Sequence, residues 1–146
     1  MFTSIVQLSQ EKWKMNCVVD TSVIIAVLVN EPERLKIIHY TKSVGLIAPA
    51  SVHWEVGNAL AAMRKKRRIA PDQIAAVLAA YASIPIRFVD VDLTLSLKIA
   101  AEHDLYAYDA YVLACARENG CRLISLDKGL LEAAKDAHVD ILEVAP

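Results

Sequence analysis

Short apolar segments without polar alternation recur along the chain, separated by longer segments whose apolar residues return every three or four positions. An unbroken apolar segment is typical of a strand buried on both faces, whereas the second spacing is typical of one helix face. The pattern predicts strands within residues 16–19, 45–48, 84–89, 122–125 and 141–144. Strands that alternate with helices predict an α/β fold, here a three-layer α/β/α sandwich with a five-stranded parallel sheet.

Helical periodicity fills the segments between these strands. We expect a helix directly after Asp20, and further helices over residues 32–42, from 51 to a basic run at 64–68, and over 71–81, 92–103, 110–119 and 128–136. The apolar stripe of the helix that begins at Ser51 is Val52, Val56, Ala59, Leu60 and Met63. The stripe predicted to face inward in residues 92–103 is Leu93, Leu97, Ala100 and Ala101.

The first predicted strand ends abruptly at Asp20, which is followed by Thr21 and Ser22. In open parallel α/β sheets the carboxyl ends of the strands border the crevice in which ligands bind. Asp20 is therefore the first candidate site residue. The simpler interpretation is that Asp20 or Ser22 only caps the following helix.

Two further acids lie near helix starts. Glu55 sits beside the apolar stripe of its helix, and Asp109 shares a helix face with Val112, Leu113 and Ala116. A carboxylate on or beside a buried face is unusual and favours a functional role. The alternative is an acid placed to suit the positive end of a helix.

Asp127 follows the fourth predicted strand as Asp20 follows the first. If these two strands are neighbours, both acids border the switch point of the sheet, and Glu55 and Asp109 can face the same crevice. Four carboxylates without a nearby Lys or His need a counter-charge. Ligation by oxygen alone indicates Mg²⁺ or Mn²⁺ as the cofactor.

Five consecutive cations, Arg64, Lys65, Lys66, Arg67 and Arg68, lie between two predicted helices. Such a run is commonly a solvated helix end, which the helix dipole favours. The formal net charge of −1 conceals a basic remainder, because 16 Lys and Arg face 13 acids once the four candidate acids are set aside. A nucleic-acid substrate is therefore electrostatically plausible, with the run as an RNA-binding element.

Composition narrows the class of protein. With 146 residues, 55% of them hydrophobic, and a mean hydropathy of +0.34, the chain suits one compact domain. The three cysteines form no C-x-x-C pair, and the four histidines make no pair at zinc-ligand spacing. No apolar segment reaches the ~20 residues of a membrane span and no signal peptide is evident, so we expect a cytoplasmic protein.

The first residues fit this pattern poorly. Residues 2–14 show neither strand alternation nor a sustained helical stripe, and Met15 directly precedes the first strand. We expect residues 1–15 to be an N-terminal extension, flexible or not native, ahead of a single domain over 16–146. The hypothesis that Met15 is the true start is testable by intact-mass measurement of the native protein.

The ordered set of these motifs resembles the PIN-domain ribonucleases, specifically VapC-type toxins of type II toxin–antitoxin modules. The matching pieces are the segment around Asp20, Glu55 after the second strand, and the segments 108–114 and 123–127. The resemblance implies that Asp20, Glu55, Asp109 and Asp127 bind one or two divalent cations and cleave RNA. Ser22 and Ser125 resemble the polar positions that orient the acids or a water, and the resemblance further implies a homodimer and an antitoxin partner.

Two other classes remain open at this point. A metal-dependent phosphatase also places Asp at strand ends, but Asp20 lacks a second acid two residues later and no Lys stands at a strand end. A catalytically inactive PIN-like domain that binds RNA or protein would retain the fold. Chemistry by paired imidazoles is disfavoured because the sequence offers no His pair.

Overall fold

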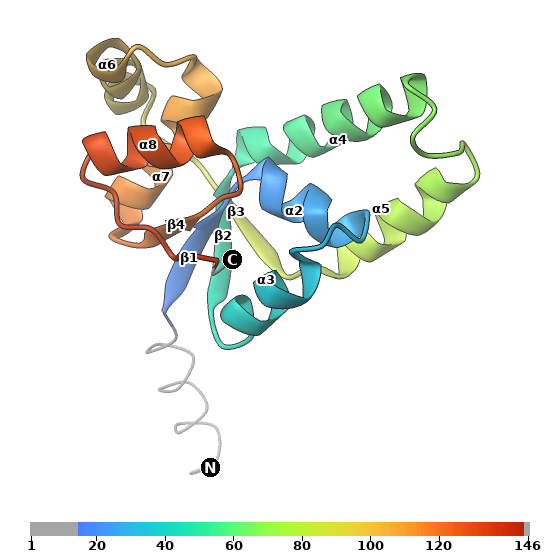
Figure 1. The fold of residues 1–146 in the computed structure, drawn as a ribbon. Helices are drawn as coiled ribbons and strands as arrows, with labels where there is room; N and C mark the ends of the chain where they lie inside the picture. The colour runs from blue at the N-terminus through green and yellow to red at the C-terminus, as the bar shows by residue number, and fades with distance from the viewer. Residues whose placement is uncertain (1–14, 145–146) are drawn as a thin grey trace, which may run out of the picture.

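A computed structural model describes residues 15–144, which form four strands and seven helices (Figure 1). In chain order these are β1 Asn16–Val19, α2 Thr21–Leu28, α3 Arg34–Thr41, β2 Gly45–Pro49, α4 Ala50–Lys65, α5 Gln73–Ser83, β3 Ile86–Val89, α6 Leu93–His103, α7 Ala107–Asn119, β4 Arg122–Ile124 and α8 Lys128–Asp136.

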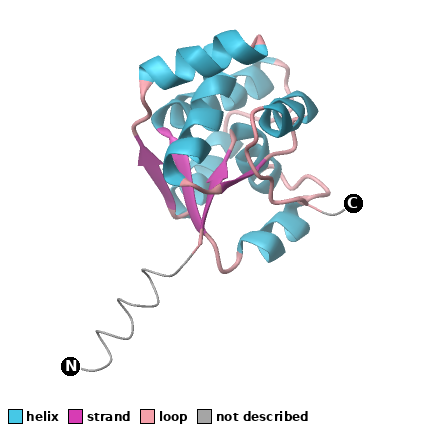
Figure 2. Cartoon of the chain, turned by 90° about the vertical axis from the view of Figure 1, so that its left-hand side faces the viewer, coloured by secondary structure: helices cyan, strands magenta, loops and turns pink. Residues whose placement is uncertain are grey.

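The four strands form one parallel sheet in the order β3-β2-β1-β4. Helices α6, α7 and α8 lie to one side of the strands and α2, α3 and α5 to the other, so the sheet is the middle layer (Figure 1). Figure 2 shows the same strands as a single twisted layer among the helices. The chain moves from β1 to β2 and β3 on one side and then crosses back to β4, which places the switch point between β1 and β4.

The core is centred on β1 and the helix that covers it. Cys17, Val18 and Val19 are at most 2% exposed, because β1 has a strand on each side and α7 packs across it. The buried residues of α7 include three alanines, Ala110, Ala114 and Ala116. Small side chains let a helix approach a sheet closely, and this approach fixes the first turn of α7 above the end of β1.

The prediction of a parallel α/β fold is confirmed, but the count of five strands is wrong for the described residues. The predicted strand at 141–144 contributes only one isolated bridge, between Leu123 and Ile141. Two hydrogen bonds hold it, from Leu123 N to Asp140 O and from Leu142 N to Leu123 O. Beside a β4 of only three residues the segment has too few paired positions to extend as a strand.

The predicted inward stripe of α6 is also wrong at three of its four positions. Leu93 and Leu97 are 58% and 50% exposed, and Ala101 is exposed as well. Ser96 and Ile99 are buried instead, and Leu95 and Ala100 are half-buried. The helix carries two possible apolar stripes. Helix α7 packs against α6 and covers the stripe that includes the small side chain of Ser96.

Helices α4 and α5 form a long hairpin that projects from the sheet (Figure 1). Four of the predicted α4 stripe residues, Val52, Val56, Leu60 and Met63, are buried, whereas Ala59 is half-buried. Helix α5 has no buried residue, so its apolar positions only flank the core. The basic run forms the exposed bend between the two helices, with Arg67 in the left-handed region at φ 57°.

The predicted N-terminal extension, apart from Met15, lies outside the described residues. The hypothesis that Met15 is the first residue therefore stays a prediction. Within residues 15–144, no helix is both long enough and apolar enough to cross a membrane.

Candidate functional site

The four acids singled out from the sequence line a single small cavity at the carboxyl edge of the sheet. This cavity, of about 100 Å³, is bordered by Asp20, Thr21, Ser22, Glu55, Asp109 and Asp127 together with two apolar residues. Asp20 follows β1, Asp127 follows β4, and Glu55 and Asp109 come from the amino-terminal parts of α4 and α7. The fold thus gathers residues up to 107 positions apart, as the predicted switch point required.

Asp20 is held by a set of hydrogen bonds at the end of β1. Its Oδ1 accepts from the Ser22 hydroxyl at 2.7 Å and from the Val23 backbone N–H at 3.3 Å, while its Oδ2 accepts from the Ser125 hydroxyl at 2.7 Å. The side chain therefore caps α2, as the simpler interpretation held. It also borders the acidic cavity while only 6% exposed, so capping and site membership coexist.

Ser22 and Ser125 join the two strand ends at the switch point. Ser22 Oγ accepts from the backbone N–H of Leu126 at 2.9 Å, and Ser125 Oγ accepts from that of Asp127 at 3.0 Å. Asp127 Oδ1 in turn accepts from Gly129 N and Leu130 N, which caps α8. The two serines therefore set the distance and orientation between Asp20 and the turn that carries Asp127.

Burial and mutual repulsion raise the pKa of three acids. Desolvation is the main cause for the raised pKa of Asp20, Glu55 and Asp109. Neighbouring charge adds to it, since Asp109 and Asp20 raise the pKa of Glu55 and Asp127 raises that of Asp109. The serine hydroxyls and the Val23 N–H partly oppose the rise in the pKa of Asp20. The cavity is thus a site of concentrated negative charge.

Two polar atoms in this cavity are buried without a hydrogen-bond partner, Thr21 Oγ1 and Glu55 Oε2. The Thr21 hydroxyl is near enough to lower the Glu55 pKa slightly, yet neither atom completes a hydrogen bond of acceptable geometry. Buried polar atoms without partners are rare and indicate a place for a ligand or water. Sequence reasoning did not single out Thr21, although its position between Asp20 and Ser22 was a usable signal.

The residues present fit a divalent cation in chemistry. The cavity offers carboxylate and hydroxyl oxygens, the Glu55 Oε2 atom lacks a partner, and a cation would relieve the repulsion that raises the three pKa values. Among residues 15–144, however, no three His, Cys, Asp or Glu side chains are arranged to hold an ion as they stand. Hydrogen bonds from serines and helix caps use three of the roughly four acceptor sites on the Asp20 carboxylate and two of those on Asp127, so both carboxylates keep a lone pair for a cation.

The basic run is not part of this cavity. All five cations are exposed, and Arg64, Lys65 and Arg67 line a separate surface hollow beside Pro71. Arg64 lies nine residues after Glu55 on α4, which corresponds to ~13 Å along the helix axis. The run therefore lies at the far end of α4 from the acids, where it can contact a long ligand but not the group bound in the cavity.

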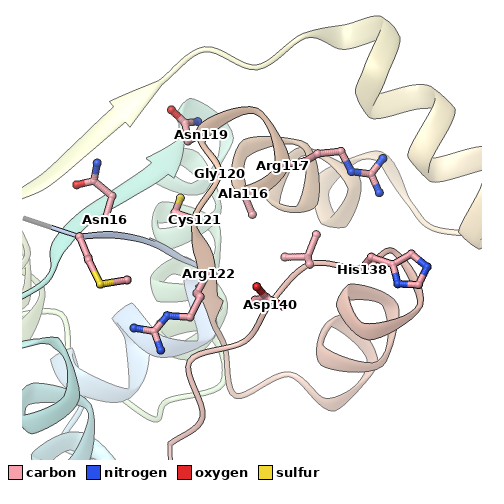
Figure 3. Close-up of a pocket in the computed structure, with 11 residues that line it drawn as sticks. Asn16, Ala116, Arg117, Asn119, Gly120, Cys121, Arg122, His138 and Asp140 are labelled. Carbon is pink, nitrogen blue, oxygen red and sulfur yellow. The ribbon is translucent and has the colours of Figure 1, made fainter.

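A second hollow lies at the opposite, amino-terminal edge of the sheet. It has a volume of about 520 Å³ and is bordered by Asn16 at the start of β1, Arg122 at the start of β4, and the end of α7 (Figure 3). Among the described residues that line it, Asp140 is the single carboxylate. The two edges of the sheet are therefore unequal, and the cluster of acids lies at the carboxyl edge.

The fold and the site define a class, that of parallel α/β domains with a carboxylate cluster at the switch point. The sequence profile of the PIN domain matches residues 17–136, which include all four acids. The chain belongs to the PIN domain family. Among curated protein sequences, none matches the chain significantly.

Solved structures of similar fold support this assignment. PAE2754 from Pyrobaculum aerophilum is 23% identical, with a TM-score of 0.65 over 82% of this chain and 86% of its own. VapC20 from Mycobacterium tuberculosis, a sarcin-ricin loop cleaving toxin, is 20% identical, with a TM-score of 0.63 over 90% and 100%. FitAcB from Neisseria gonorrhoeae is 19% identical, with a TM-score of 0.58 over 88% and 97%. At these identities the likeness concerns the fold.

Proposed function

We propose that this protein is a divalent-cation-dependent endoribonuclease, and that it serves as the toxin of a toxin–antitoxin pair. The observation that carries the proposal is the convergence of Asp20, Glu55, Asp109 and Asp127 on one cavity of a PIN domain. The fold likeness to VapC20, a sarcin-ricin loop cleaving toxin, supports RNA as the substrate.

The chain's own residues have distinct tasks in this proposal. The carboxylates of Glu55 and Asp109 do not cap a helix, and they would be the principal ligands of Mg²⁺ or Mn²⁺. Asp20 and Asp127 would complete the set of ligands. A bound cation supplies Lewis acidity that activates a water and neutralises charge on the phosphoryl oxygens. Ser22 and Ser125 keep Asp20 oriented, so that its carboxylate faces the cavity rather than rotating into solvent.

The arrangement favours hydrolysis that leaves a 5′-phosphate and a 3′-hydroxyl. No His from residues 15–144 lines the acidic cavity, so these residues supply no imidazole to protonate a leaving group or to activate a ribose hydroxyl. The basic run contributes sequence-independent attraction to the RNA backbone at a distance from the acids. An antitoxin that covers the site is part of the same proposal and is supported by the fold likeness to VapC20 and FitAcB. A homodimer is proposed with it, as the resemblance to VapC-type toxins implies.

The proposal is tested by incubating the purified protein with structured RNAs in chelator, Mg²⁺ or Mn²⁺, and mapping the product ends. Cleavage only with a divalent cation, with 5′-phosphate ends, supports it. Metal-independent cleavage with cyclic phosphate ends would place the activity in a different chemical class. RNA that binds the protein but stays uncleaved under all conditions would favour a catalytically inactive RNA-binding domain.

A further inference from the structure

Another cavity, distinct from the hollow at the amino-terminal edge, lies beside the acidic cavity at the carboxyl edge of the sheet. It has a volume of about 330 Å³, and its lining includes Pro49, Ser51, Val89, Asp90, Val91 and Tyr111. This volume is within the ~300–1,000 Å³ range that is typical of small-ligand sites. The residues come from the ends of β2 and β3, the first turn of α4, and α7.

The cavity is within one nucleotide of the acids. Pro49 ends β2 as Asp20 follows β1, and paired strands are separated by ~4.8 Å. Ser51 precedes Glu55 by four residues on α4, which places both on one helix face at about 6 Å between their Cβ atoms. A chain bound with one phosphate at the acids can therefore place an adjoining group in this cavity.

The polar groups of the cavity call for both an acceptor and donors on the ligand. The Ser51 Oγ atom is buried and has no hydrogen-bond partner. Helix α4 begins beside it after Pro49 with no side chain capping the first turn. The backbone N–H groups of this first turn are free to donate to a ligand oxygen, whereas the buried Ser51 hydroxyl is out of a ligand's reach. Asp90, an exposed carboxylate of the same lining, can only accept.

The walls favour a flat, neutral ligand over an anion. Val89 and Val91 are apolar, and Tyr111 offers an aromatic ring whose edge-to-face contact with Tyr108 has a centroid distance of 5.9 Å. Within the described part of the chain no Lys or Arg borders the cavity, and Asp90 would repel a phosphate. Nucleobases are bound in proteins by aromatic stacking together with hydrogen bonds to their edges.

We propose that this cavity is a nucleobase subsite for the residue next to the scissile phosphate, and that it selects a base with a carbonyl beside N–H donors. Guanine suits it best, because its O6 accepts from the backbone N–H groups at the start of α4 while its ring N1–H and its exocyclic amine donate to Asp90. Uracil offers one such donor, and adenine and cytosine offer no matching pair. The subsite gives the proposed nuclease its base preference, and so rests on that proposed function.

Binding of the four nucleosides, which carry no phosphate for the acids to repel, followed by amide NMR of the full chain in chelator, tests the subsite without any cleavage. Guanosine is expected to shift the amide signals of Ala50, Ser51 and Tyr111, with affinity decreasing in the order guanosine, uridine, then adenosine and cytidine. Equal affinity for all four nucleosides, no binding of guanosine, or shifts confined to other surfaces would overturn the proposal. Because the assay needs no activity, a chain that binds guanosine here but cleaves no RNA would refute only the nuclease function.

Paired variants make the test specific to the lining. Asp90→Asn should weaken guanosine binding roughly 5-fold or more and lower the guanosine to adenosine affinity ratio, since one amide oxygen replaces the two carboxylate oxygens that accept the guanine donors. Asp72→Asn is the matched control, an exposed acid whose side chain makes no capping hydrogen bond, and it should leave guanosine binding unchanged. Unchanged guanosine binding in Asp90→Asn, or an equal loss in Asp72→Asn, would contradict the subsite.

Discussion

The Ser125 hydroxyl donates a hydrogen bond of 2.7 Å to Asp20 Oδ2, and thereby ties the ends of β4 and β1 together across 105 residues of sequence. The Ser125 hydroxyl oxygen in turn accepts from the Asp127 backbone N–H at 3.0 Å. Ser125 is only 5% exposed, so water cannot easily replace either bond. This one side chain therefore positions two of the four acids.

Ser125→Ala should destabilise the protein by about 1–3 kcal/mol, because it leaves a buried carboxylate oxygen and a backbone N–H each short of a partner. Chemical denaturation monitored by circular dichroism measures the change. Ser83→Ala, at an exposed position of α5, is the control and should change the free energy of unfolding by less than about 0.5 kcal/mol. Ser125→Thr keeps the hydroxyl and should retain most of the stability; equal losses in the Ala and Thr variants would mean that the hydroxyl is not the cause.

Glu55→Gln and Asp109→Asn should each lower the rate of metal-dependent RNA cleavage by about 100-fold or more, since a ligand carboxylate contributes several kcal/mol through the cation. Asp20→Asn should have a similar effect. Asp127→Asn should reduce the rate less, because Asn still caps α8 and one Asp127 oxygen is already committed to that cap. Single-turnover cleavage in Mn²⁺ is the measurement, and wild-type rates in any of the first three variants would remove that residue from the site.

Asp109→Asn should raise the melting temperature of the metal-free protein at neutral pH. The folded-state pKa of Asp109 is raised by burial and by Asp127, so the folded state binds more protons than the unfolded state between the two pKa values. Stability therefore falls as pH rises through that window, and the full penalty is present at neutral pH. Because solvent screens a half-buried group, we expect a gain of only about 1–3 °C in chelator, which should disappear once the pH falls below the unfolded-state pKa of about 4.

A divalent cation should reverse the order of the two melting temperatures, so that the wild type melts above Asp109→Asn. At ten times its Kd the cation should stabilise the wild type by about 1.4 kcal/mol, or roughly 4–6 °C, and should stabilise Asp109→Asn much less. Thermal melts of both proteins in chelator and in Mn²⁺ measure this, with Asp136→Asn as a control at an exposed position of α8. Equal cation-induced shifts in wild type and Asp109→Asn would falsify the assignment of Asp109 as a ligand.

Neutralising Lys65 and Lys66 should weaken RNA binding and reduce its salt dependence. Removing one phosphate contact lowers the slope of log affinity against log salt by ~0.7–0.9. Fluorescence anisotropy with a labelled single-stranded RNA, over a salt range of about 50 to 200 mM, gives the slope. Lys36→Gln with Lys42→Gln, two exposed lysines at α3, is the charge-matched control. If the slope of log affinity against log salt equals that of the control pair, the basic run is solvated surface that does not contact the RNA.

The sequence alone located most elements of the fold because their signals are local. The predicted helix at 128–136 matches α8, and the predicted end at 119 matches α7, which Gly120 terminates in the left-handed region at φ 58°. Turn chemistry and apolar periodicity depend on neighbouring residues only. The same reasoning placed Asp20 and Asp127 at strand ends, and the two serines beside them.

Other features depended on which surfaces meet, and only the tertiary structure decided them. Leu93 and Leu97 form as good an apolar stripe as Leu95 and Ile99, and the packing of α6 on α7 chose the second. The segment at 141–144 has strand-like residues, but a strand exists only where a neighbour offers a matching edge, and β4 is short. The lack of a partner for the Thr21 and Ser51 hydroxyls is likewise a property of the space around them, which no pattern of residue types along the chain records.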